Sequence, residues 1–266
     1  MTSVPKGTAI VTGAAQGLGR AISLRLADDG YDVAVNDITS NTENLKTLVT
    51  EITARGRRSS AIFADVTNED EVKEMVGSVV KQFGGLDVMV ANAGIIRVGT
   101  LLETTTADFE ANFAVSVRGT FLCYKYAAEQ MVAQGRGGRL IGASSVAGKQ
   151  GHPNQIAYCS AKFAVRGLTQ CAALELGRYG ITVNSYAPGA MVTPMLESIR
   201  VMNDNRGSDS GQFYDGDYYK RMADRSSVGY LGKADDVASV VSYLVSKEAH
   251  FITGQSISVD GGVHLS

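Results

Sequence analysis

The alternation of strand-like and helix-like segments along the whole chain is the feature that most limits its fold. Short runs rich in Val, Ile and Ala recur, and longer amphipathic stretches separate them. The short runs are apolar on both faces, as in strands buried within a parallel sheet. We therefore predict an α/β fold, a doubly wound parallel sheet of about seven strands with helices on both faces.

The predicted strands share β-branched and small apolar residues, and they lie at Thr8–Thr12, Asp32–Asn36, Ser60–Ala64, Leu86–Ala91, Arg139–Ala143, Thr182–Tyr186 and Ser256–Val259. The predicted helices carry apolar residues at helical spacing, and they cover Leu18–Asp29, Thr42–Arg55, Glu69–Phe83, about Ala107–Ala133 and about Ile156–Tyr179. Neither a repeat nor a low-complexity linker divides these elements, so we expect residues 1–266 to form a single domain.

Residues 194–232 interrupt the alternation. This segment contains the polar stretch Asn203–Gly216 and then Tyr218, Tyr219 and Met222. Long segments of this kind inside a compact domain are lids or disordered loops. The segment follows the carboxyl end of a predicted strand, where open α/β sheets bind ligands. We therefore expect a substrate lid, with idle disorder as the alternative.

The first predicted strand runs into a glycine-rich turn, TGAAQGLG, which precedes an amphipathic stretch. Glycines at positions 13, 17 and 19 allow a tight turn and let backbone N–H groups approach a pyrophosphate at a helix N-terminus. A glycine-rich turn also occurs as a plain connection between a strand and a helix. Its position after the first strand favours a dinucleotide site in a Rossmann-type domain.

Asp37 closes the second predicted strand. A carboxylate at this place can bind both ribose hydroxyls of an adenosine, and it repels a 2′-phosphate. Gln16 stands inside the glycine turn, where a basic residue would instead attract that phosphate. Both residues favour NAD over NADP. The alternative role for Asp37 is that of a turn-forming residue.

Tyr158 and Lys162 stand at i and i+4 in the stretch YCSAK, and Ser145 ends the upstream apolar run RLIGASS. Residues at this spacing share one face of a helix. An ammonium ~4 Å from a phenol attracts its phenolate by roughly 4 kcal/mol at an effective dielectric of ~20, which is about 3 pKa units. The spacing therefore predicts a tyrosine of lowered pKa that acts as a general acid or base, with the Ser145 hydroxyl holding a substrate oxygen. A surface tyrosine and lysine on an ordinary helix is the alternative.

With these motifs together, the chain resembles the short-chain dehydrogenases/reductases of about 250 residues, over essentially its whole length. The family's motifs occur in order as Thr12–Gly19 (TGxxxGxG), Asp65 and Val66 (DV), Asn92, Ala93 and Gly94 (NAG), Ser145 with Tyr158 and Lys162 (YxxxK), and Pro188, Gly189 and Thr193 (PGxxxT). The closing TGQSISVDGG also resembles the family's last strand.

The resemblance implies reversible hydride transfer between a nicotinamide cofactor and a secondary alcohol or ketone. It implies that Ser145, Tyr158 and Lys162 are catalytic. It further implies cofactor contacts from Gly13, Gln16, Gly17, Leu18, Gly19, Asp37, Asp65, Val66, Asn92, Ala93, Gly94, Tyr158, Lys162, Pro188, Gly189, Met191 and Thr193.

One position departs from the family. Its NxxGxF pattern reads Ser116-Val117-Arg118-Gly119-Thr120-Phe121 here, so Ser116 replaces an asparagine that helps to hold a water connecting the lysine with solvent. Serine keeps a donor and an acceptor but reaches less far. We expect Ser116 to preserve a modified relay as a fourth catalytic residue. A packing role for Ser116 is the alternative.

Several partners are excluded by composition. The net charge is −2, so the chain has no basic footprint for nucleic acid or an anionic membrane. We expect no signal peptide and no transmembrane span, because the apolar runs are short. Three cysteines without CxxC spacing favour reduced thiols and a cytoplasmic protein. The three histidines are scattered, so we expect no metal site.

The resemblance also implies a homotetramer that packs the two longest helices across a two-fold axis. Small residues suited to close approach recur in the second of these, at Ala157, Ala161, Ala164, Gly167 and Leu168, and a core-facing stripe explains them equally well.

The substrate predicted by resemblance is a small or cyclic ketone or a diketone, as in diacetyl reductases and butanediol dehydrogenases. A 3-oxoacyl reductase is the runner-up, although residues 195–230 carry no obvious basic patch for an acidic carrier protein. A dinucleotide-binding redox sensor without turnover is a further alternative. A methyltransferase would leave YCSAK and Pro188–Thr193 without a purpose.

Overall fold

The computed structural model describes residues 4–205 and 217–265. Within these residues one parallel sheet of seven strands runs in the order β3-β2-β1-β4-β5-β6-β7. The strands are β1 (Thr8–Thr12), β2 (Asp32–Asp37), β3 (Ser59–Phe63), β4 (Val88–Ala91), β5 (Gly138–Ala143), β6 (Ile181–Pro188) and β7 (Ser256–Val259). This is the predicted Rossmann-type sheet, and each predicted strand is present with small shifts at its ends.

The strand order reverses beside β1, which is the third of the seven strands across the sheet. β1 pairs with β2 on one side and with β4 on the other, both in parallel. All five residues of β1 and all four of β4 are buried, which explains their continuous apolar sequence. The crevice beyond the carboxyl ends of strands at such a reversal is where open α/β sheets bind ligands.

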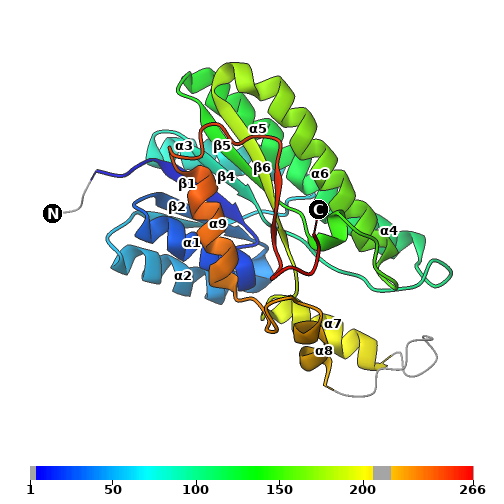
Figure 1. Cartoon of the computed structure of the whole chain (residues 1–266). Helices are drawn as coiled ribbons and strands as arrows, with labels where there is room; N and C mark the ends of the chain where they lie inside the picture. The colour runs from blue at the N-terminus through cyan, green and yellow to red at the C-terminus, as the bar shows by residue number, and fades with distance from the viewer. Residues whose placement is uncertain (1–3, 206–216, 266) are drawn as a thin grey trace.

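One face of the sheet is covered by α1 (Gly17–Asp28), α2 (Thr42–Ala54) and α9 (Ala234–Val245) (Figure 1). Apolar residues on the inward stripes of these helices pack against the sheet and exclude water, among them Ile22, Leu26, Leu45, Leu48, Ile52 and Val241. The glycine turn between β1 and α1 is thereby fixed between a buried strand and a buried helix face.

The other face is covered by α3 (Glu69–Phe83), α5 (Gly119–Gln134) and α6 (Ile156–Leu176). Asn68 begins α3, where its side chain accepts hydrogen bonds from the backbone N–H groups of Asp70 and Glu71. A second apolar cluster, which includes Val72, Met75, Leu122, Met131 and Ala173, joins these helices to the sheet. The start of α6 lies on this face of the sheet, beside the carboxyl end of β5.

The first of the two predicted long helices is interrupted. The stretch from Ala107 to Ala133 contains α4 (Thr106–Phe113), a π-helical turn at Ala114–Arg118, and α5. Single π-helical turns inside helices occur frequently at functional sites. The second predicted long helix is α6, which continues into a 3-10 turn at Gly177–Tyr179.

The segment after β6 contains helices. It forms α7 (Pro194–Asn205) and α8 (Tyr218–Asp224), which extend beyond the carboxyl edge of the sheet (Figure 1). Most of the predicted polar stretch 203–216 lies outside the described residues. Glu197 of α7 accepts a hydrogen bond from the Tyr219 hydroxyl of α8, so the two helices are joined.

Candidate active site

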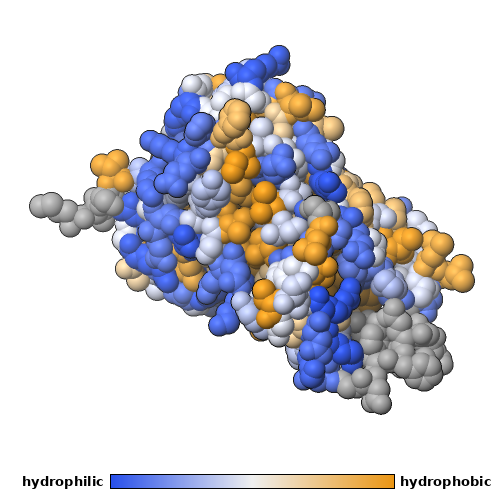
Figure 2. Space-filling model, viewed as in Figure 1, coloured by the Kyte–Doolittle hydropathy of each residue, from blue (hydrophilic) through white to orange (hydrophobic). Residues whose placement is uncertain are grey.

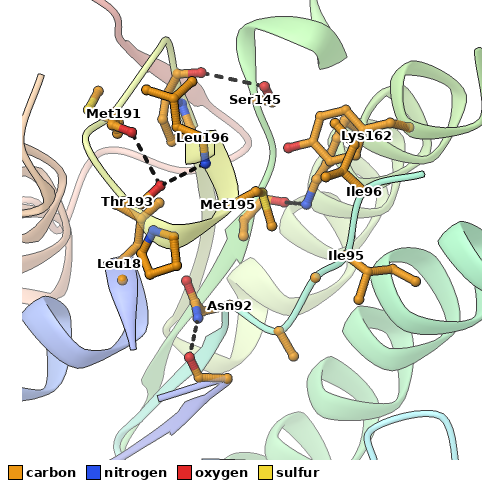
Figure 3. A pocket seen from close by; sticks show the side chains of 18 of the residues that line it. Leu18, Asn92, Ile95, Ile96, Ser145, Lys162, Met191, Thr193, Met195 and Leu196 are labelled. Carbon is orange, nitrogen blue, oxygen red and sulfur yellow. Dashed lines mark hydrogen bonds between the residues drawn. The ribbon is translucent and has the colours of Figure 1, made fainter. Parts of the chain in front are cut away.

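A cavity of about 510 Å³ lies along the carboxyl ends of the strands. Its walls come from the segments that follow β1, β2, β3, β4, β5 and β6, together with residues of α6, α7 and α8. Figure 3 shows Ser145, Lys162, Asn92 and Thr193 converging on it from separate elements. The sheet therefore gathers motifs that lie far apart in the sequence.

Glycines form a cradle at one end of this cavity. Gly13 has a φ of +60°, and a Cβ there would lie 2.9 Å from the Cα of Ala93. A Cβ on Gly19 would collide with the carbonyl oxygen of Gly13. Gln16 begins α1 without capping it through its side chain, so the first N–H groups of the helix remain available for an anion. The cradle fits the pyrophosphate of a dinucleotide.

Asn92 holds this turn in place. Its amide nitrogen donates to the carbonyl oxygens of Thr12 at 2.8 Å and Gly13 at 3.0 Å, and its oxygen accepts from the Tyr186 hydroxyl at 2.7 Å. The side chain of Asn92 is thus engaged within the protein, and the residue, for which the sequence predicts a cofactor contact, lines the cavity.

Asp37 lies beside the cradle. Its Oδ2 accepts from the backbone N–H of Ala15 at 3.0 Å, and its Oδ1 accepts from the Asn41 amide at 2.9 Å. The carboxylate is therefore fixed at the end of the cavity that an adenosine ribose would occupy. Asp65 and Val66 line the same end, as the sequence predicts.

The residues after β6 form the opposite rim. Pro188, Gly189, Met191 and Thr193 all line the cavity. The Thr193 hydroxyl donates to the Met191 carbonyl at 3.2 Å and accepts from the Leu196 N–H at 3.5 Å (Figure 3). These bonds hold the turn at which α7 begins.

Ser145, Tyr158 and Lys162 meet at the centre of the cavity. The Ser145 hydroxyl accepts from the N–H of Ala147 at 3.1 Å and donates to the Pro188 carbonyl at 3.4 Å. Tyr158 and Lys162 lie on the inner face of α6 and are only 9% and 4% exposed. The Lys162 ammonium donates to the Ala143 carbonyl at 2.8 Å. The three predicted catalytic side chains are therefore close together in a buried environment.

The predicted lowering of the tyrosine pKa is wrong for the protein without cofactor. Burial raises the pKa of Tyr158 to about 12, and a hydrogen bond with Ser145 only partly opposes this. Burial also lowers the pKa of Lys162 to about 8. The cause is desolvation, which disfavours both charged forms where water is excluded. The lysine nitrogen lies 5.4 Å from the centre of the tyrosine ring, a geometry that leaves desolvation dominant.

Ser116 lies in the π-helical turn and is 1% exposed. A Cβ placed on Gly94 would lie 3.7 Å from the Ser116 hydroxyl oxygen and 3.4 Å from the Lys162 nitrogen. The two polar atoms therefore approach the same point. Within the described residues the Ser116 oxygen is buried and has no hydrogen-bond partner.

Several polar lining residues were not singled out by the sequence analysis. They are Asn41, Tyr186, His152 and Gln155 of the expected wall segment Val146–Gln155, and Arg225 of the expected lid. Asn41 follows Asp37 at i+4 in a helix start, a signal that was present in the sequence. The others reach the cavity only through the packing of distant segments, and local spacing does not reveal that.

The sequence predicts neither a membrane span nor a metal site, and both predictions can be compared with the described residues, 4–205 and 217–265. None of their helices is long and apolar enough to cross a membrane. Their His, Cys, Asp and Glu side chains form no group that could hold a metal ion.

The doubly wound sheet and its glycine cradle define a nucleotide-binding protein of Rossmann type. Residues 13–264 match the family model described as enoyl-(acyl carrier protein) reductase. A short-chain dehydrogenase/reductase of Armillaria gallica is 50% identical over 263 residues, 98% of each chain. A 3-oxoacyl-[acyl-carrier-protein] reductase of Staphylococcus aureus is 41% identical over 258 residues, covering 97% of this chain and 98% of the relative.

Solved structures agree with this relationship. An acetoin dehydrogenase of Salmonella typhimurium matches with a TM-score of 0.83 and 31% identity over 97% of this chain and 95% of that chain. A short-chain dehydrogenase of Burkholderia cenocepacia in complex with NADP matches with a TM-score of 0.84 and 36% identity over 96% of each chain. The protein belongs to the short-chain dehydrogenase/reductase family and is an oxidoreductase of the kind that binds a nicotinamide cofactor.

Proposed function

We propose that this protein transfers hydride reversibly between NAD(H) and a secondary alcohol or ketone. The observation that carries the proposal is the convergence of Ser145, Tyr158 and Lys162 on one cavity, beside a glycine cradle. The cofactor supplies the hydride or accepts it, and the protein orients the reactants and moves the proton.

Three side chains of the protein would transfer the proton and stabilise the developing charge. Tyr158 donates its proton to the carbonyl oxygen during reduction and receives it during oxidation. Its raised pKa keeps the phenol protonated at neutral pH, the form that reduction requires. Ser145 donates to the same oxygen and stabilises its developing charge. Lys162 adds positive charge behind the phenol, which stabilises the phenolate once the proton has left.

Asp37 supports NAD as the cofactor. Its anchored carboxylate would accept hydrogen bonds from ribose hydroxyls and would repel a 2′-phosphate. The solved relative in complex with NADP makes NADP the second candidate. An Asp37→Ser variant should therefore gain activity with NADPH relative to NADH.

Apolar walls support a small or cyclic ketone or diketone as the substrate. Ile96, Met195 and Ile199 pack around Tyr158 at the end of the cavity away from the cradle. We propose that α7 and α8 act as a lid over this end, since both helices contribute lining residues. The likeness to an acetoin dehydrogenase supports the same substrate class.

Two other functions remain candidates. The relative from Staphylococcus aureus favours reduction of a 3-oxoacyl thioester on a carrier protein. A redox sensor without turnover would need the cradle alone, and it would leave the buried Ser145, Tyr158 and Lys162 without a role.

We propose a homotetramer in the cytoplasm. Phe121 of α5 and Phe163 and Leu174 of α6 are exposed apolar residues on the two long helices. Ala157 and Ala161 of the predicted small-residue face instead belong to the chain's own core, whereas Gly167 is exposed. Three free thiols support a reducing compartment. The mass of the protein in solution tests the assembly.

The deciding experiment is a substrate screen. Purified protein is incubated with NADH or NADPH and with a panel of ketones, cyclic ketones, diketones and 3-oxoacyl thioesters, and the loss of cofactor absorbance is followed. Turnover of a ketone or diketone with preference for NADH supports the proposal. Binding of NADH without turnover of any carbonyl compound would favour the sensor.

A further inference from the structure

The charges around the cavity are distributed unevenly. Among the described residues that line it, the acidic ones are Asp37 and Asp65, both at the adenosine end. At the opposite end the basic lining residues besides Lys162 are His152 and Arg225. Among the described residues, no acidic side chain lines the substrate end, so none there would repel an anion.

Arg225 is directed to the cavity by its helix. Tyr218, Met222 and Arg225 follow one face of α8 and its C-cap at i, i+4 and i+7, and all three line the cavity. Lys220 and Asp224 pair with each other at 2.6 Å and do not line it. Within the described part of the chain Arg225 has no carboxylate partner. In Figure 2 hydrophilic side chains gather over the end of the molecule where α8 lies.

His152 faces the same end from a loop that is held in place. Its backbone N–H donates to the Cys159 sulfur at 3.4 Å, and the Gly99 N–H donates to the Asn154 carbonyl at 2.8 Å. Its Nε2 is buried and has no hydrogen-bond partner among the described residues, so the protein does not use the full bonding capacity of the ring. Burial lowers the pKa of His152, and the charges of Arg225 and His264 lower it further.

We propose that Arg225 and His152 form an anion subsite, and that the substrate is a ketone carrying a carboxylate. A guanidinium binds carboxylates through a planar pair of donors, and a neutral imidazole can donate a further hydrogen bond. The apolar residues between this subsite and Tyr158, such as Ile96 and Met195, suit the carbon chain that joins the two ends. The inference deepens the proposed function and rests on it.

Matched substrates test the inference. The values of kcat/KM for 3-oxobutanoate, 4-oxopentanoate and 5-oxohexanoate are compared with those for their methyl esters at saturating NADH and, separately, NADPH. At low ionic strength the acid of the best-fitting length should exceed its ester by roughly fivefold, the upper end of the range for an exposed ion pair. Added KCl should lower the rate with the acid and leave that with the ester nearly unchanged.

Variants of α8 provide the control. Arg225→Met should abolish the preference for the acid, and Arg225→Glu should invert it. Lys220→Met removes a cation from the same helix outside the cavity and should leave the preference unchanged. NADH binding, measured by fluorescence, verifies that each variant is folded.

The outcomes distinguish failure of the anion subsite from failure of the proposed ketone reduction. Equal use of acid and ester by the unaltered protein, without an effect of salt, would overturn the anion subsite alone. An acid preference that survives in Arg225→Met would do the same. Failure to reduce any acid or ester, while a cyclic ketone or diketone is reduced, would overturn the anion subsite alone. Failure with every one of these carbonyl compounds and with either cofactor would overturn the proposed ketone reduction as well.

Discussion

The ammonium nitrogen of Lys162 lies 5.4 Å from the centre of the Tyr158 ring and donates to the carbonyl oxygen of Ala143 at 2.8 Å. The lysine is thus held by the end of β5 and not by the tyrosine hydroxyl. Both side chains are almost fully buried, so desolvation opposes their charged forms. At neutral pH the lysine is the charged member of this pair, so its burial lowers the free energy of unfolding.

The first prediction concerns the stability cost of Lys162. Its pKa falls from 10.5 to about 8 on folding, so the unfolded chain binds the proton more tightly. Below pH 8 this costs up to about 3 kcal/mol of unfolding free energy. The cost shrinks as pH rises from 8 to 10.5, because the folded form has then already lost its proton.

Lys162→Met should therefore raise the unfolding free energy at pH 7 by ~1–3 kcal/mol, with the lower value applying if the Ala143 carbonyl loses its partner. The gain should disappear above about pH 10.5, the value for an unfolded lysine. Denaturant melts across pH measure it. Lys46→Met, at a residue whose side chain is 63% exposed, is the control and should change stability by less than ~0.5 kcal/mol. A pH-independent effect of Lys162→Met would contradict the assignment.

The second prediction concerns the direction of the reaction at different pH values. Reduction requires the protonated phenol, and the raised pKa of Tyr158 supplies that form throughout the neutral range. Oxidation requires the phenolate, whose fraction increases as pH rises. Initial rates in both directions from pH 6 to 10 should show oxidation rising with pH while reduction stays level below the Lys162 pKa of about 8. An oxidation rate that falls between pH 6 and 8 would argue against Tyr158 as the base.

The third prediction concerns Tyr158→Phe. Removal of the proton donor should lower turnover by about 10²–10⁴-fold, the usual contribution of a general acid. The aromatic ring remains, so the core around Ile96 and Cys159 stays packed and NADH affinity should change by less than about threefold. Fluorescence titration and initial rates provide both values. A variant that retains most of its activity would remove Tyr158 from the mechanism.

The fourth prediction concerns Ser116. Its buried hydroxyl lies near Lys162 without a partner in the described structure, a place where a water can bridge polar groups. If the hydroxyl serves a proton relay, Ser116→Ala should slow turnover about tenfold and shift the pH–rate profile, with NADH binding intact. Ser116→Asn, which introduces the family's usual residue, should restore part of the rate. If Ser116 only packs the turn, alanine should leave the pH profile unchanged.

The fifth prediction compares two helical glycines. A Cβ on Gly19 would collide with the Gly13 carbonyl and with the Asn92 amide, so Gly19→Ala should distort the cradle and weaken NADH binding at least tenfold. Gly77 has nothing within 4 Å of the same added atom. Gly77→Ala should therefore stabilise α3 by about 0.5–1 kcal/mol through helix propensity, without any effect on NADH affinity. Calorimetry and fluorescence titration distinguish the two effects. Unchanged NADH affinity in Gly19→Ala would show that the cradle does not hold the cofactor.

Much of this protein could be predicted from local sequence. The buried strands, the glycine turn and the i, i+4 pair Tyr158 and Lys162 depend on periodicity and on spacing within a few residues. The helix α3 matches its prediction at both ends because Asn68 caps it and Gly84 follows it in a left-handed conformation. Such features follow from the chain's own stereochemistry.

Predictions from local sequence were wrong or incomplete where contacts between distant segments determine the structure. The stretch around Ser116 has the composition of an ordinary helix, and packing against α6, which is distant in sequence, accompanies its π-helical turn. The raised pKa of Tyr158 reflects burial by segments that are remote in sequence. The approach of Arg225 to His152 also joins α8 to a loop far upstream.

The amino-acid sequence by itself determined the sheet, most of the helices that cover it and the side chains that we propose as catalytic groups, since these depend on short-range geometry and on burial patterns. The tertiary structure alone decided the protonation state of those groups and the charge at the substrate end of the cavity. The reason is that desolvation and Coulomb energies depend on distances through space, and spacing along the chain does not specify those distances.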